Sequence, residues 1–187
     1  INAELDKKII TEIVNPTFQA IKDMGENYKG FLYVGLMIKD NNPYLIEYNV
    51  RMGDPECQTI LPLLATDLLD LILSCCDETL EKQNILWEEK KSMCVVLCSK
   101  GYPDIYKKNV EIPNIEKIED NDSFFIYHAG TKKKNNKVYA NGGRVLNFVS
   151  ISENLKSSRE ILIRKIENLN WKEGFYRRDI GYKIIDK

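Results

Sequence analysis

The stretch that decides the fold is Ile46-Glu-Tyr-Asn-Val-Arg-Met-Gly-Asp-Pro-Glu56. Its first half alternates polar and apolar residues, which is typical of a β-strand because successive side chains point to opposite faces. Glu47, Asn49 and Arg51 therefore fall on one face of the expected strand. The run Gly53-Asp-Pro55 then turns the chain sharply, so two carboxylates follow directly after the polar face.

The polar face has the residue types of a metal and phosphate site. A carboxylate and an amide oxygen two residues apart can share one hard cation, because Mg²⁺ prefers oxygen ligands and keeps phosphates and waters in its other positions. A guanidinium one pleat further along can bind a phosphate oxygen. The set is therefore suited to metal–nucleotide chemistry, with Glu47 and Asn49 as candidate metal ligands and Arg51 as a candidate phosphate ligand. The alternative for these three residues alone is a surface ion pair between Glu47 and Arg51 on an ordinary hairpin.

Composition is that of an ordinary globular protein. The chain has 187 residues, of which 43% are hydrophobic and 29% charged, enough for one large domain or two small ones. Its 27 basic and 28 acidic residues leave a net charge of −1, so no overall field attracts nucleic acid or an anionic membrane. No apolar run approaches the roughly 20 residues of a membrane span. We expect neither a nucleic-acid nor a membrane partner.

The cysteines and the single histidine are expected to be structural. The five cysteines have no C-x-x-C spacing, which favours reduced thiols in a cytoplasmic protein and disfavours a zinc site. His128 follows a β-prone run and precedes Ala129-Gly-Thr131. It is expected to hold a turn at a strand end; a proton shuttle is the alternative.

The pattern along the chain divides into a first segment, a polar linker and a second segment. Apolar spacing predicts an amphipathic helix, a hairpin and a second helix in the first segment. The predicted elements are a helix over 3–24 interrupted near Pro16, strands over 31–38 and 44–50 around a turn at 39–43, and a helix from Asp67 to about Leu80 capped by Thr66.

The second segment is expected to be rich in strands. They are predicted over 93–98, 124–127, 137–140 and 145–151, before a helix along Leu155, Leu162, Ile166 and Leu169 and a closing strand within 175–181. Asn141-Gly-Gly143 should form a tight turn between the last two strands, of type I′ if the glycines serve the turn alone. The basic run 132–137 reads as a solvated loop.

Taken together, these motifs resemble those of a known protein family. The run Gly30-Phe-Leu-Tyr-Val-Gly-Leu-Met37, followed by residues 46–56, resembles the end of the ATP-grasp domain of phosphoribosylamine:glycine ligases. Further landmarks resemble, in order, the C-terminal domain of that family: Gly101-Tyr-Pro103, His128-Ala-Gly-Thr131, Asn141-Gly-Gly-Arg-Val-Leu146 and Tyr176-Arg-Arg-Asp-Ile-Gly181. One departure from the wider ATP-grasp pattern is Gly35, where a second acidic metal ligand often sits.

The resemblance implies an α+β fold. Residues 1–80 would be the C-terminal part of an ATP-grasp domain, 81–91 a linker, and 92–187 a small, mostly antiparallel β domain with one long helix. A Rossmann-like domain and the first parts of the ATP-grasp domain are expected before Ile1. The chain alone should therefore fold without catalysing, and apolar surface in its first segment could lead to self-association.

The resemblance also implies a reaction, ligation of glycine to 5-phosphoribosylamine in purine biosynthesis. The glycine carboxylate would attack the γ-phosphate of ATP, with Mg²⁺ or Mn²⁺ as cofactor, and the amine would then displace phosphate from glycyl phosphate. Arg51 and Asp54 are assigned to catalysis, and the residues assigned to substrate are Asp54, Glu56, Gly142, Gly143 and Arg144. Two alternatives remain open: another ATP-grasp carboxylate–amine ligase, and a non-catalytic binding module.

Overall fold

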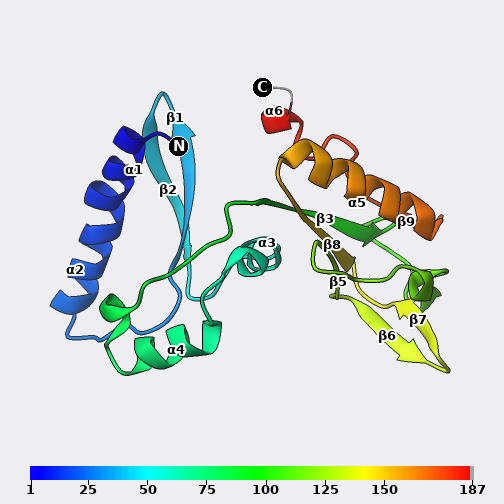
Figure 1. Cartoon of the computed structure of the whole chain (residues 1–187), viewed down its shortest axis with the longest axis horizontal. Coiled ribbons are helices and arrows are strands. Elements are labelled where there is room, and N and C mark those ends of the chain that lie inside the picture. The colour runs from blue at the N-terminus through cyan, green and yellow to red at the C-terminus, as the bar shows by residue number, and fades with distance from the viewer. Residues whose placement is uncertain (186–187) are drawn as a thin grey trace. The chain divides into compact units, whose positions relative to one another are not determined.

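The chain forms two compact units in a computed structural model, which describes residues 1–185. The first unit consists of Ile1–Gly53 and Thr66–Asn84, and the second of Asp54–Ala65 together with the chain from Ile85 onward. The α+β class is confirmed, since helices and antiparallel strands occur in both units (Figure 1). The segment 54–65 groups with the second unit, while the domain limits expected at residues 80 and 91 stay a prediction.

The first unit opens with the expected interrupted helix. Its parts are α1 (Ala3–Ile9), a π-helical turn (Ile10–Val14) and α2 (Asn15–Asp23). The helix begins where Asn2 accepts a 2.8 Å hydrogen bond from the Leu5 N–H. Pro16 lies in the first turn of α2, where its missing N–H is tolerated, and the wider π turn comes directly before it.

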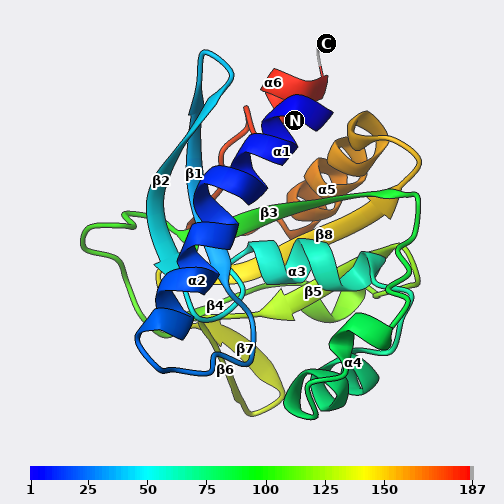
Figure 2. The same cartoon turned by 90° about the vertical axis from the view of Figure 1, so that its left-hand side faces the viewer.

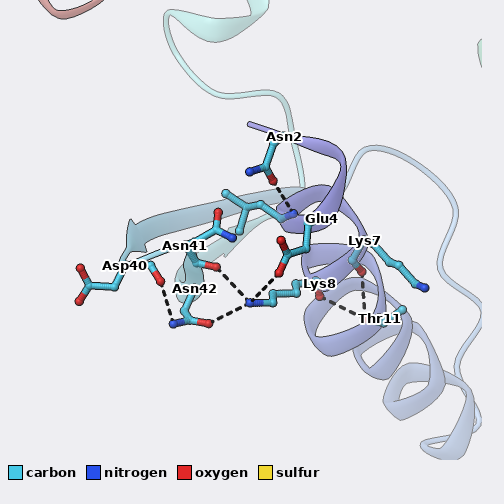
Figure 3. A network of polar contacts seen from close by, with 9 residues as sticks. Asn2, Glu4, Lys7, Lys8, Thr11, Asp40, Asn41 and Asn42 are labelled. Carbon is cyan, nitrogen blue, oxygen red and sulfur yellow. Dashed lines mark hydrogen bonds and ion pairs between the residues drawn. The ribbon is translucent and has the colours of Figure 1, made fainter.

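The predicted hairpin is confirmed as β1 (Tyr33–Lys39) paired antiparallel with β2 (Asn42–Asn49). Asp40 and Asn41 between them have φ of 49° and 57°, as a type I′ turn requires. Figure 3 shows how Lys8 ties this turn to α1: its Nζ lies 3.4 Å from the Asn41 carbonyl oxygen and 3.3 Å from Asn42 Oδ1. The ammonium also lies 3.7 Å from the Glu4 carboxylate.

The second predicted helix is shorter than expected and has a different cap. It is α4 (Leu68–Cys76), followed by a short 3₁₀ turn (Leu80–Lys82). Asp67, not Thr66, is the N-cap, because its carboxylate accepts from the Leu69 N–H at 2.7 Å. The cap on Thr66 was therefore wrong by one residue.

Much apolar surface of the first unit stays exposed. Val50 is 73% exposed, Ile46 61% and Leu69 62%, far above the values of core residues. Further exposed apolar side chains of the hairpin are Met37, Ile38, Tyr44, Leu45 and Tyr48. Extended apolar patches of this kind are typical of surfaces that contact another protein segment.

The second unit is built on a four-stranded antiparallel sheet in the order β5-β8-β3-β9. These strands are β5 (Phe124–His128), β8 (Arg144–Ser152), β3 (Lys91–Ser99) and β9 (Gly174–Phe175). The predicted long helix is confirmed as α5 (Leu155–Leu169), and its Leu162, Ile166 and Leu169 are buried in the core. The short α3 (Glu56–Ile60) also contacts β3 and β8 (Figure 2).

A second, three-stranded sheet corrects two predictions. Its order is β4 (Val110–Glu111), β7 (Lys137–Ala140), β6 (Thr131–Lys134). The basic run 132–137 is thus part of a hairpin and not a loop, with Asn135 and Asn136 at φ of 50° and 59° in its turn. Since β7 and β8 belong to different sheets, Asn141-Gly-Gly143 links two sheets and does not close a hairpin.

The chain beyond α5 is mostly irregular. Of the closing strand expected within 175–181, only Phe175 is in β9, and the short α6 (Tyr182–Ile185) follows. Arg159 of α5 holds this segment: its Nε donates to the Ile180 carbonyl at 3.0 Å and its Nη2 to the Arg178 carbonyl. Among the helices within residues 1–185, none combines the length and apolar character that crossing a bilayer demands.

Candidate functional site

The first unit carries the candidate metal ligands at the end of β2. Asn49 Nδ2 donates a 3.0 Å hydrogen bond to Glu47 Oε1, so the two side chains lie on one face of the strand as expected. If the terminal amide of Asn49 rotates by about 180°, its oxygen takes the position of its nitrogen and lies next to the Glu47 carboxylate. Two oxygen donors would then face one point, the arrangement that a hard cation requires.

Gly35 makes room for the Glu47 side chain. It lies opposite Glu47 in the β1–β2 register, next to an irregularity between Gly35 and Leu36. A β-carbon on Gly35 would lie 3.0 Å from Glu47 Cγ and 3.4 Å from its carbonyl oxygen. The missing side chain of Gly35 therefore lets Glu47 lie close to the neighbouring strand.

Arg51 lies beyond the strand, contrary to the expected extended pattern. β2 ends at Asn49, and Arg51 occupies a bend. Its Nη1 donates a 2.8 Å hydrogen bond to the carbonyl of Met52, so this guanidinium is held by the adjoining backbone. Strand alternation no longer fixes its direction, because the bend interrupts the pleat.

The donor set fits a divalent cation that is shared with substrate oxygens. Within residues 1–185, no three His, Cys, Asp or Glu side chains come together as a metal-binding group. Glu47 and Asn49 would supply two ligands of the cation, and phosphate oxygens and water would supply others. Mg²⁺ is usually bound in this way at nucleotide sites.

The second unit brings together two predicted substrate residues, Asp54 and Arg144. Arg144 Nη2 lies 3.0 Å from Asp54 Oδ2, and Nη1 lies 3.4 Å from the Asp54 carbonyl oxygen. The two residues are 90 positions apart in sequence. Glu56, the third predicted residue in this region, is the first residue of α3.

Glycines before Arg144 are required by close packing. A β-carbon on Gly143 would lie 2.1 Å from Cδ2 of Tyr102, and one on Gly142 would lie 2.9 Å from the Gly130 α-carbon. Neither Gly142 nor Gly143 has the positive φ of a type I′ turn. The expected turn type is therefore wrong, and the missing side chains serve contact between backbones and with an aromatic ring.

Backbone N–H groups of this link are already engaged. The N–H groups of Asn141 and Gly142 both donate to the Gly130 carbonyl, at 2.8 and 3.0 Å. The Gly143 carbonyl accepts from the Ser99 N–H at 2.8 Å, and the Gly142 carbonyl from the Ser99 hydroxyl at 2.8 Å. The N–H groups of Asn141 and Gly142 are therefore not free to bind an anion, and Arg144 is the charged group next to them.

The pKa values of two thiols reflect the charged residues near them. Burial, followed by the negative charges of Asp54 and Glu56, raises the pKa of Cys94 to about 12. Burial also raises the pKa of Cys98, although the positive charge of Arg144 opposes that change. The acidic residues thus lie near Cys94 and the guanidinium near Cys98, on the same strand β3.

His128 lies at the end of β5, and its Nδ1 is 2.9 Å from the Thr131 hydroxyl. This contact spans the turn between β5 and β6. The predicted turn-holding role is the one that the geometry supports.

Sequence reasoning missed two supporting residues and a cavity. Tyr102, whose ring covers Gly143, falls within the landmark Gly101-Tyr-Pro103 but has no predicted role, and no sequence pattern singles out Arg159. Beside α5 lies a cavity of about 330 Å³. Its lining residues are Arg159, Glu160, Ile163, Arg164, Glu167, Tyr176 and Arg178, none of them a predicted site residue.

Comparisons with known proteins agree along the chain. Residues 1–57 match the model of the phosphoribosylglycinamide synthetase ATP-grasp (A) domain, and residues 92–183 match that of the phosphoribosylglycinamide synthetase C domain. A phosphoribosylamine–glycine ligase of Caldanaerobacter subterraneus is 43% identical over 184 residues, which are 96% of this chain and 43% of that protein. The ligase of Fusobacterium nucleatum is 42% identical over 178 residues, 95% of this chain and 42% of that protein.

A solved structure is also similar. The crystal structure of the phosphoribosylamine–glycine ligase of Thermotoga maritima matches with a TM-score of 0.81 and 32% identity. The match covers 96% of this chain and 44% of that one. The chain therefore spans less than half the length of the curated relatives that it matches.

Proposed function

The chain belongs to the phosphoribosylamine–glycine ligase family, and we propose that it contributes the metal-binding strand and the C domain to an enzyme that joins glycine to 5-phosphoribosylamine with ATP. The observation that carries the proposal is the pair of side chains at the end of β2. Glu47 and Asn49 lie 3.0 Å apart on one face, within the segment that matches the ATP-grasp model.

The proposed roles follow from the chemistry of each residue. Glu47 and Asn49 would hold Mg²⁺ or Mn²⁺, and the cation would neutralise charge on the ATP phosphates during phosphoryl transfer. Arg51 would exchange its contact with the Met52 carbonyl for a phosphate oxygen, which binds a guanidinium more strongly than a neutral carbonyl does. No side chain needs to act as a nucleophile, because the glycine carboxylate attacks the γ-phosphate.

In the second unit, Arg144 would bind the phosphate of 5-phosphoribosylamine and Asp54 would orient its amine. Glu56, Gly142 and Gly143 are proposed to border the same substrate. The support for Arg144 is its half-exposed guanidinium, since 44% of the side chain is open to solvent. A cytoplasmic location is proposed as well, in keeping with the five free cysteines and with a biosynthetic role.

The test is Glu47→Gln in a full-length ligase that contains this segment. The substitution keeps the size of the side chain, replaces one carboxylate oxygen by an amide NH2 group, and removes the negative charge that would bind the metal. We expect ADP formation dependent on glycine and 5-phosphoribosylamine to fall by about 100-fold or more, as when a charge stabiliser of the transition state is lost. Glu88→Gln, an exposed carboxylate outside the proposed site, serves as control. Full activity of Glu47→Gln would remove the metal assignment.

Self-association is a further proposal, supported by the exposed apolar side chains of the hairpin. Light scattering behind size exclusion should show a mass that rises with concentration, and Ile46→Asp should lower it. A constant monomer mass at high concentration would contradict this proposal.

A further inference from the structure

The pair formed by Arg144 and Asp54 differs from a buried ion pair, because both side chains remain open to water. Their exposed fractions are 44% and 45%, with a closest distance of 3.0 Å. Exposed pairs of this kind contribute only about 0–1 kcal/mol to stability. The contact can therefore be replaced at little cost by a stronger anion.

The backbone that carries Arg144 is, by contrast, well fixed. Arg144 begins β8, and its register with Cys98 of β3 follows an irregularity next to Leu97. The preceding Gly143 carries two constraints, the Tyr102 ring above it and the Ser99 N–H on its carbonyl. A fixed backbone with a half-exposed guanidinium suits a residue that changes partner without a change of fold.

One anion already lies against Arg144, the Asp54 carboxylate at 3.0 Å. The carboxylates of Asp54 and Glu56 both act on Cys94, whereas Arg144 is the cation that acts on neighbouring Cys98. An anion that approaches Arg144 must therefore compete with Asp54. A phosphate monoester can do so, because it carries about −1.5 to −2 charges at pH 7 and three acceptor oxygens that match the guanidinium fork.

We propose that Arg144 and Asp54 form an exchangeable pair, in which the phosphate of a sugar-phosphate ligand displaces the Asp54 carboxylate from the guanidinium and frees it to accept a hydrogen bond from the ligand. This inference rests on the proposed function and deepens it, since it couples phosphate recognition to the release of the residue that orients the amine. The carboxylate is held by Arg144 until the phosphate arrives. Binding of the phosphate would thus free Asp54 to contact the rest of the ligand.

An exchangeable pair and a permanent structural contact predict opposite results for one substitution. If Asp54 competes with the phosphate, Asp54→Asn removes the competitor and tightens binding. If Asp54 instead holds Arg144 in its binding position, the same substitution releases the guanidinium and weakens binding.

The experiment is a calorimetric titration of this chain with ribose 5-phosphate at low salt. We expect Asp54→Asn to bind between about 1.5-fold and fivefold tighter than wild type, the range that corresponds to the strength of an exposed pair. Arg144→Ala should bind about tenfold or more weakly, because a hydrogen bond to a charged group is lost. Arg144→Lys should fall between, since it keeps the charge but not the fork.

Asp179→Asn is the matched control, because Asp179 forms a comparable exposed pair with Arg177 in the same unit, at 2.8 Å. It should leave the affinity unchanged. Far-ultraviolet circular dichroism and melting of each variant check that the fold is retained, and Arg144→Lys keeps the test decisive if Arg144→Ala does not fold.

The outcomes are separable. Equal or weaker binding by Asp54→Asn would overturn the exchange, as would the absence of binding by both wild type and Asp54→Asn. Tightening for ADP but not for ribose 5-phosphate would overturn the assignment to a sugar phosphate. Failure of the proposed ligase function would show instead in the Glu47→Gln assay, which does not depend on Asp54 or Arg144.

Discussion

The contact between Gly143 and Tyr102 leads to a prediction whose size follows from the structure. In Gly143→Ala the new β-carbon would lie 2.1 Å from Cδ2, 2.6 Å from Cε2 and 3.1 Å from Cγ of the Tyr102 ring. Carbon atoms normally approach to about 3.5–4.0 Å. The ring or the loop that carries it must therefore move.

The expected loss is about 1–3 kcal/mol in the free energy of unfolding, the usual cost of extra volume in a packed site. Backbone strain adds little, because Gly143 does not have a positive φ that would disfavour alanine. In a Tyr102→Ala background the obstacle is absent, and Gly143→Ala should cost less than about 0.5 kcal/mol. The coupling free energy between the two substitutions should thus be nearly as large as the loss of stability caused by Gly143→Ala alone.

Urea unfolding of the wild type, both single variants and the double variant measures this coupling. Tryptophan fluorescence is a suitable signal, because Trp87 and Trp171 both belong to the second unit. Gly25→Ala is the control: its φ of 78° makes alanine costly by itself, but its β-carbon meets no atom within 4 Å, so this cost should show no coupling to Tyr102. Additive losses for Gly143→Ala and Tyr102→Ala would refute the reasoning.

Three further predictions concern the rest of the chain. Between the ordinary thiol pKa of 9.0 and the Cys94 pKa of about 12, the unfolded state loses a proton that the folded state keeps. The free energy of unfolding should therefore fall by about 1.4 kcal/mol per pH unit from this thiol, and Cys94→Ala should reduce the slope measured by urea unfolding at each pH; an unchanged slope would contradict the assignment. Asn154→Ala removes the acceptor for the Ser157 N–H and should lower the stability of the second unit by about 1 kcal/mol in the same assay, whereas Asn154→Asp should be nearly neutral. Lys8→Met should speed amide exchange in the β1–β2 turn, with Lys22→Met as control; equal exchange rates would show that the lysine does not hold the turn.

Local pattern was enough to predict the hairpin and the long helix. Alternation over 44–50 and the α5 face of Leu162, Ile166 and Leu169 depend on neighbours within a few residues, and the structure confirms both elements. The same alternation placed Glu47 and Asn49 on one face. It failed at Arg51, where the strand had already ended and the pleat no longer applied.

The pairing of strands that are distant in sequence could not be predicted in the same way. Asn141-Gly-Gly143 has the composition of a hairpin turn, but β7 pairs with β4 and β6 while β8 pairs with β3 and β5. A turn signal reports that the chain bends, and the sheet that each strand joins depends on contacts far away in sequence. The Arg144–Asp54 pair, separated by 90 residues, was hidden for the same reason.

The glycines and the arginine of the C domain therefore have different tasks, although they are adjacent in sequence. Gly142 lies against Gly130, and Gly143 lies under Tyr102, so their missing side chains allow three loops to meet. The N–H groups of Asn141 and Gly142 donate to the Gly130 carbonyl at this contact, so they are not available to bind an anion. Under the proposed function, charge recognition would fall to Arg144, whose half-exposed side chain has one exposed carboxylate as its present partner. Close packing of the glycines thus fixes the place from which the Arg144 side chain reaches solvent.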